Sequence, residues 1–228
     1  MPSRIELPEH LRDAVFTTGE ARAAGIGRGR LRGGDLAHPF RGIHREGAVP
    51  GELTALCEAL LPALGPSQWF SHLTAARLWG MPTPFRWSVD EPLHVLALGD
   101  TPPMRRRGVV GWETESADIP GRFLGPLPVI DPAAVWCELS VPGALGPRRA
   151  MTQEWLVAVG DFLLSGARAR VRRPLCTRGS LVEAAVRHRN KRGNKALSWA
   201  LERLRTGVDS PKESIFRRRS ASTCVICP

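Results

Sequence analysis

Residues 17–25 (TTGEARAAG) predict a short helix and decide how the first part of this chain folds. Thr17 suits the N-cap, and Glu20 stands three residues later, which is the spacing of a capping box. Gly25 suits the left-handed position that follows the end of a helix. The chain must therefore turn sharply after residue 25, so that any following helix lies beside the first.

Residues 26–36 (IGRGRLRGGDL) follow at once and predict a second helix, with Leu31 and Leu36 facing inward. Two short helices joined by a tight turn indicate a helix-turn-helix, whose second helix enters the major groove of DNA. Arginine in that helix can bind guanine bidentately or contact phosphates. The arginines expected to point outward for this purpose are Arg28, Arg30 and Arg32.

Residues 37–46 (AHPFRGIHRE) have a turn at Gly42 and predict a short β-hairpin of the kind called a wing. Wings hold phosphates or reach into the minor groove. The wing residues expected to contact DNA are Arg41, His44 and Arg45. Small helix-turn-helix units also serve as protein-interaction modules, and three glycines weaken this second helix by about 1 kcal/mol each relative to alanine.

The middle of the chain predicts a mixed α/β body. Apolar patterns with N-cap and stop residues predict helices at 52–63, 69–80, 131–139 and 155–164 and strands at 93–98 and 109–114. Trp136 and Trp155 are candidate core residues. The two strands flank a run of arginines, and we expect it to form a hairpin loop that either contacts phosphate or is simply solvated. That run is Arg105, Arg106 and Arg107.

The C-terminal part predicts two more helices, at 180–189 and 195–205, joined by a basic turn. This pair is equally consistent with a surface for nucleic acid and with a solvated face. The expected fold is therefore α+β in three parts: a winged helix-turn-helix at 1–48, the mixed body at 49–175, and a basic helical segment at 176–228.

Residues 209–219 (DSPKESIFRRR) predict the start of a further helix, with Ser210 at the N-cap, Pro211 at the first helical position and Glu213 closing a capping box. Only nine residues follow, so we expect the C-terminus to be truncated or frame-shifted. This motif resembles the first helix of very-short-patch-repair-like endonuclease domains of the PD-(D/E)xK class. The resemblance implies that Glu213 matches a metal-binding carboxylate, but one carboxylate cannot hold Mg²⁺ for cleavage.

Composition narrows the class of protein. No apolar run approaches the twenty residues of a membrane span, and the N-terminus lacks the apolar region of a secretory signal, so we expect a cytoplasmic protein. Five scattered cysteines favour reduced thiols over a disulfide framework. Only Cys224 and Cys227 have metal or redox spacing, and they lack a second pair. The sequence predicts no metal site and no cofactor.

Charge is distributed unevenly. Residues 1–140 carry 14 basic and 16 acidic side chains, whereas residues 141–228 carry 18 basic and 6 acidic ones. A pI near 10.7 favours a polyanionic partner. Arginine outnumbers lysine 29 to 3, however, which also fits a GC-rich coding sequence.

Taken together, the motifs resemble the antitoxin-like family of abortive-infection type IV toxin–antitoxin systems. The matching segments are residues 16–25, 41–43, 71–80, 93–95, 105–108, 131–133 and 159–161. The resemblance implies a winged helix that binds the operon's own promoter and a body that neutralises a nucleotidyltransferase toxin. Many actinobacterial relatives add the endonuclease-like domain. This chain departs from the family at Gly29, Gly33 and Gly34 and in its short nuclease-like segment.

The expected function is thus a transcriptional regulator that binds double-stranded DNA, possesses no enzymatic activity, has a nucleotidyltransferase-like toxin as a partner, and dimerises on DNA. The alternative is the targeting portion of a metal-dependent DNA endonuclease that is inactive as it stands. A decayed gene product without a selected function is a third interpretation.

Overall fold

The computed structural model describes residues 6–165 and 173–205, and it has an α+β fold, as predicted. The described chain forms two compact units. The first unit consists of residues 6–69, 87–115 and 123–127, and the second consists of residues 70–86, 116–122, 128–165 and 173–205. These units cut across the three parts expected from the sequence, whose boundaries stay a prediction. The segment with Glu213, Cys224 and Cys227 lies outside the described residues.

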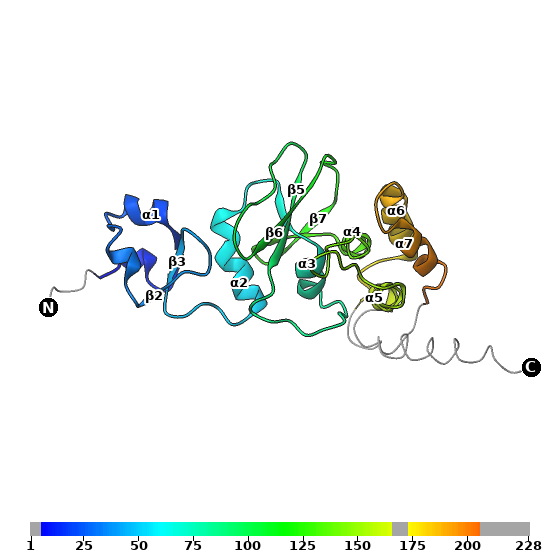
Figure 1. Cartoon of the computed structure of the whole chain (residues 1–228), viewed down its shortest axis with the longest axis horizontal. Helices are drawn as coiled ribbons and strands as arrows, with labels where there is room; N and C mark the ends of the chain where they lie inside the picture. Colours follow the sequence, from blue (N-terminus) through cyan, green and yellow to red (C-terminus); the bar gives the residue numbers. More distant parts are fainter. Residues whose placement is uncertain (1–5, 166–172, 206–228) are drawn as a thin grey trace, which may run out of the picture. The chain divides into compact units, whose positions relative to one another are not determined.

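The first unit begins with a small three-stranded antiparallel sheet of order β1-β3-β2 (Figure 1). Its elements are η1 (Glu9–Leu11), β1 (Val15–Thr17), α1 (Thr18–Ala23), η2 (Arg30–Arg32), β2 (Leu36–Ala37) and β3 (Ile43–Glu46). The predicted cap of α1 is confirmed, because Thr17 Oγ1 accepts from the Glu20 amide and Glu20 Oε2 accepts from the Thr17 amide. Gly25 is left-handed, with φ 77°. The hairpin with its turn at Gly42 is also present.

The prediction of a second helix over residues 26–36 is wrong. The segment forms only one short turn of 3₁₀ helix, η2, and Leu36 belongs to β2. Glycine disfavours helix by about 1 kcal/mol at each position, and a short helix has few hydrogen bonds to offset that cost. Leu31 and Leu36 are nevertheless buried as expected, in a cluster that also contains Phe16.

The larger sheet has five strands in the order β6-β5-β4-β8-β7. They are β4 (Gln68–Phe70), β5 (Leu93–Leu98), β6 (Val109–Thr114), β7 (Gly121–Leu124) and β8 (Leu127–Ile130). The bounds of β5 and β6 agree with the prediction, but the hairpin expected between them is wrong. These strands are parallel, with Leu93 opposite Val109. The connection at residues 99–108 must therefore run back along the sheet before β6 begins.

Gly111 explains how this returning connection fits. A Cβ atom at Gly111 would lie 2.2 Å from the carbonyl oxygen of Met104, so the connection passes directly over the glycine. Any larger residue forces two backbone segments apart.

We expect Gly111→Ala to lower the free energy of unfolding by about 2 kcal/mol, because it overpacks a contact between backbones. Urea unfolding of the two proteins measures this difference. Gly51→Ala is the matched control, because Gly51, like Gly111, has no positive φ and no atom lies within 4 Å of a Cβ there. Equal stability of Gly111→Ala and the unchanged protein would refute the close passage.

The first unit also holds α2 (Leu53–Leu60) and η3 (Leu61–Ala63), and the other helices belong to the second unit. Those are α3 (His72–Leu78), α4 (Pro132–Glu138), α5 (Gln153–Ser165), α6 (Arg178–His188) and α7 (Asn194–Leu201). Asp131 caps α4 as predicted, by accepting from the Ala133 amide. Trp136 is fully buried and its indole N–H donates to the Leu156 carbonyl at 2.8 Å. Trp155 is only half-buried, which corrects its assignment to the core.

Candidate nucleic-acid interface

A hollow of about 1030 Å³ opens within the first unit. Its lining residues come from three regions: residues 18–44 of the N-terminal part, α2 and the segment before it, and the residues just before β5 and just before β6. The lining residues are Thr18, Arg28, Leu31, Arg32, His38, Pro39, Phe40, Arg41, Gly42, His44, Val49, Leu56, Val89, Asp90, Glu91, Pro92, Arg107 and Gly108.

Four arginines from three separate segments converge on this hollow. Arg28 and Arg32 flank or belong to η2, Arg41 lies in the β2–β3 turn, and Arg107 lies just before β6. All four are exposed, and none of them forms an ion pair with another described residue. Their guanidinium groups are therefore available to an anionic ligand.

Two carboxylates, Asp90 and Glu91, also line the hollow. The four arginines still leave a positive balance at neutral pH, which attracts polyanions. The lining also includes the buried apolar side chains of Leu31, Phe40 and Leu56.

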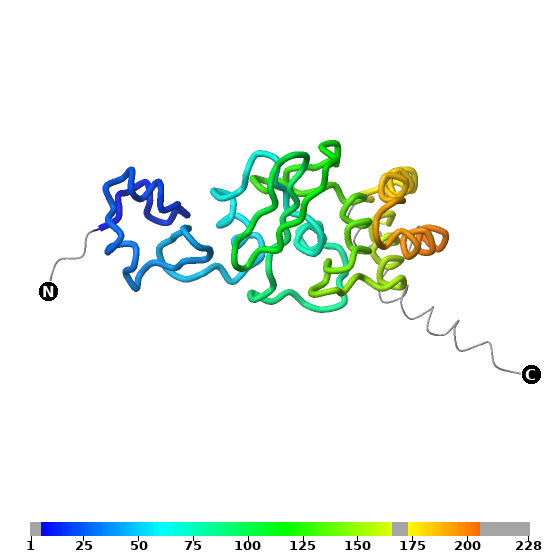
Figure 2. Tube along the Cα trace, turned by 45° about the horizontal axis from the view of Figure 1, so that its top comes forward, coloured from blue at the N-terminus to red at the C-terminus, as the bar shows by residue number. Residues whose placement is uncertain are grey.

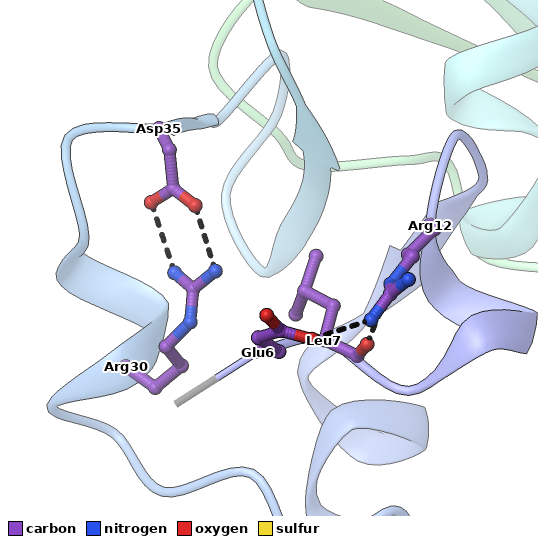
Figure 3. A network of polar contacts seen from close by, with 5 residues as sticks. All are labelled: Glu6, Leu7, Arg12, Arg30 and Asp35. Atoms are coloured by element: carbon purple, nitrogen blue, oxygen red, sulfur yellow. Dashed lines mark hydrogen bonds and ion pairs between the residues drawn. The ribbon is translucent and has the colours of Figure 1, made fainter. Parts of the chain in front are cut away.

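Arg30, which the sequence placed with the DNA-contacting arginines, has a structural role instead. Its two terminal nitrogens donate to the two carboxylate oxygens of Asp35 at 2.9 and 2.7 Å (Figure 3). The side chain is only 7% exposed, so the prediction that it points outward is wrong. Figure 3 also shows Arg12 donating to the Leu7 carbonyl and to Glu6. Arg30 therefore stabilises the segment around η2, whereas Arg12 is half exposed and its ion pair with Glu6 lies at the surface.

His44 lines the hollow but is buried, against the expectation of an exposed wing contact. Its ring stacks on Phe16, its Nε2 lies 2.9 Å from Thr18 Oγ1, and its Nδ1 lies 2.9 Å from His38 Nδ1. Burial, and secondly the nearby His38, lower the pKa of His44. The neutral His44 ring therefore packs inside the first unit against Phe16. His38, which the sequence did not single out, is the exposed member of the pair.

The other predicted phosphate contacts are dispersed. Arg45 is half-buried in β3, where its Nε donates to the Glu46 carbonyl, and it does not line the hollow. Arg106 donates to the Arg41 carbonyl and so ties the β5–β6 connection to the wing turn. Arg105 is exposed elsewhere, so Arg107 is the one member of the triple arginine in the lining.

The described residues offer no metal centre, because no three His, Cys, Asp or Glu side chains among them gather in a suitable group. Cys57, Cys137 and Cys176 are buried thiols, and burial raises the pKa of each. They are therefore poor nucleophiles and poor metal ligands.

A cluster of Ser71, His72 and Glu138 in the second unit has the residue types of some hydrolase active sites, but it is buried inside the unit. Ser71 Oγ lies 3.0 Å from His72 Nδ1, and Glu138 Oε2 accepts from the His72 amide at 2.8 Å. Burial raises the pKa of Glu138 to about 7, although the bond from the His72 amide acts against this. All three side chains are buried, and Glu138 satisfies the first amide of α3, whose N-cap residue Ser71 forms no side-chain capping bond.

The chain matches no protein-family profile, and no curated protein is significantly similar to it. Within residues 6–165 and 173–205, no helix combines the length and the apolar character needed to cross a membrane.

Proposed function

We propose that this protein is a DNA-binding regulator, similar to the antitoxins of type IV toxin–antitoxin systems, that binds DNA through the arginine-lined hollow. The observation that carries this proposal is the convergence of Arg28, Arg32, Arg41 and Arg107, all without ion pairs among the described residues, from three segments of the first unit. Exposed guanidinium groups bind phosphate bidentately and with a charge-assisted hydrogen bond.

The geometry favours phosphate contacts over the reading of bases. A recognition helix inserts several side chains into the major groove, whereas η2 has only three residues. The contacts that we propose differ from those expected from the sequence, because Arg30 is paired with Asp35 and because Arg107 lines the hollow. We therefore expect binding that depends steeply on salt and only modestly on sequence.

The toxin partner and the dimer on DNA belong to the same proposal. They rest on the resemblance of the sequence motifs to the antitoxin-like family. Co-purification of the chain with a nucleotidyltransferase encoded beside it tests the first, and the stoichiometry of the DNA complex tests the second.

Fluorescence anisotropy across a salt series tests the hollow. One variant replaces an arginine from each segment with alanine, at Arg32, Arg41 and Arg107. Its matched control removes the same charge at exposed positions away from the hollow, at Arg22, Arg86 and Arg149. The probes are the duplex upstream of the gene and a scrambled duplex.

We expect the hollow variant to bind at least tenfold more weakly at 0.1 M salt, and the salt slope to fall by about 0.9 for each phosphate that the variant no longer neutralises. The control should stay within about twofold of the unchanged protein. Equal reductions in affinity for the two variants would show that net charge alone, and not the hollow, is responsible for binding.

A further inference from the structure

The turn between α6 and α7 carries a second concentration of positive charge, in the second unit. Five of the nine residues from 187 to 195 are cationic, and none is acidic. The cations are Arg187, Arg189, Lys191, Arg192 and Lys195, and all are exposed. We call residues 187–195 the basic turn.

None of these five cations forms an ion pair with a carboxylate among the described residues. Burial raises the pKa of the neighbouring Glu138, and the bond from the His72 amide and the charge of Lys191 both act against this. The acidic residues of the flanking helical segments that lie nearest in sequence are Glu183 and Glu202. The basic turn therefore presents a largely uncompensated charge to solvent.

The backbone of the basic turn is held in place from within the second unit. His188 is buried, and its Nε2 lies 3.0 Å from the Arg192 carbonyl, to which it donates. The Lys191 amide donates to the His188 carbonyl at 2.9 Å. Gly193 has φ 91°, and a Cβ there would lie 2.2 Å from Ser140 Oγ. The turn is thus ordered before any ligand arrives, which lowers the entropic cost of binding.

Packing of the helices supports this order. Figure 2 shows α6 and α7 side by side, and α7 lies close to α5 within the same unit. Gly160 of α5 makes this approach possible, since a Cβ there would lie 2.3 Å from a methyl group of Leu204. The helices on both sides of the turn are therefore packed against other helices of the same unit, α6 against α4 and α7 against α5.

We propose that the basic turn is a second nucleic-acid site, which binds the phosphodiester backbone independently of the hollow. Three of its cations are arginines, which match phosphate geometry, and Asn190 and Asn194 add amide donors. Its exposed residues include no apolar side chain. A site for anionic membranes would need a wide apolar face with large side chains, whereas α6 exposes only Val182 and Val186 before the turn.

Lysine labelling tests this site without any substitution. The chain has three lysines, and two of them, Lys191 and Lys195, lie in the basic turn. The full chain is acetylated with an amine-reactive reagent, with and without a scrambled 20-base-pair duplex, and each lysine is quantified by mass spectrometry. We expect the duplex to reduce acetylation of both lysines at least threefold relative to the N-terminal amine. Unchanged acetylation at saturating duplex would overturn the proposal.

A pair of charge-matched variants provides the second test. One carries Arg189→Gln, Arg192→Gln and Lys195→Gln, and it keeps Lys191, whose charge acts on Glu138. The other carries Arg148→Gln, Arg149→Gln and Arg173→Gln. We expect the first to bind the duplex three- to tenfold more weakly at 0.1 M salt with a smaller salt slope, and the second to bind within about twofold of the unchanged protein. Equal affinities in the two variants would contradict the site.

Anionic vesicles of phosphatidylcholine and phosphatidylserine separate the two classes of partner. If the first variant loses vesicle binding but still binds the duplex, the ligand of the basic turn is a membrane surface and not nucleic acid, and the proposal is overturned. The hollow variant distinguishes this inference from the proposed function. If the hollow variant binds DNA normally and the basic-turn variant does not, the second site is supported and the hollow is refuted. If only the hollow variant loses binding, the hollow is supported and the second site is refuted.

Discussion

Arg30→Ala is expected to lower the free energy of unfolding by about 3 kcal/mol, because it leaves the Asp35 carboxylate partly buried without its bidentate partner. The pair lies over Gly33, where a Cβ would meet both Asp35 Oδ1 and Arg30 Nη1. It therefore holds together the segment that runs from η2 into β2. Urea unfolding followed by circular dichroism measures the change.

The double variant Arg30→Ala with Asp35→Ala is the control. It removes both charges, so it should recover part of the stability that the single variant loses. The opposite pattern, unchanged stability together with a loss of DNA affinity in Arg30→Ala, would restore the role in DNA contact that the sequence suggested.

Acid is expected to destabilise the first unit through His94. This residue lies in β5, is buried, and accepts a hydrogen bond at Nδ1 from the Trp112 indole N–H at 3.1 Å. Burial lowers the pKa of His94 from 6.5 to about 4. An indole can only donate, so protonation of Nδ1 would also break this bond.

The direction of this effect depends on how many protons His94 binds in the folded chain and in the unfolded chain. Above pH 6.5 the ring is neutral in both, and stability does not depend on it. As the pH falls from 6.5 to about 4, the unfolded chain gains a proton that the folded chain does not, so the free energy of unfolding falls by about 3 kcal/mol in total. Below about pH 4 both states are protonated and the loss stops growing. Burial also lowers the pKa of His44 and of His188, which adds to the loss.

Urea unfolding at pH 7 and at pH 4 measures this loss. The variant His94→Asn keeps an acceptor near Nδ1 but does not titrate, so its stability should fall by about 3 kcal/mol less over this range than that of the unchanged protein. His10→Asn, which removes an exposed imidazole, should follow the unchanged protein. Parallel pH profiles for His94→Asn and the unchanged protein would show that His94 is not the group responsible.

Local features of this chain could be predicted because a few neighbouring residues determine them. The capping box of Thr17 and Glu20, the left-handed Gly25 and the Asp131 cap each depend on hydrogen bonds or dihedral angles within about four residues. The bounds of β5 and β6 followed from apolar runs between turn residues. The α+β class followed from the mixture of these patterns.

The pairing of these elements could not be predicted in the same way. Strand bounds do not say whether β5 and β6 are parallel, because that depends on where a ten-residue connection packs and on the bare backbone of Gly111. Apolar spacing over residues 26–36 predicts a helix, but the glycines of this segment disfavour it, and only the short turn η2 forms. Asp35, which binds the Arg30 side chain, is only five residues away in sequence. Nothing in the spacing of these residues distinguishes Arg30 from an arginine that points outward.

The residue types and the local turns of this protein are thus properties of its sequence: an arginine-rich module with a capped first helix, a hairpin with a glycine turn, and a basic segment between two later helices. Which arginines are available for a ligand is a property of the folded chain. Arg107 lies with Arg32 and Arg41 in the lining of one hollow. Arg30 is instead paired with Asp35, and His44 is buried. The reason is physical, since a side chain's partner and its burial depend on residues brought close by long-range packing, whereas capping and turn formation depend on neighbours along the chain.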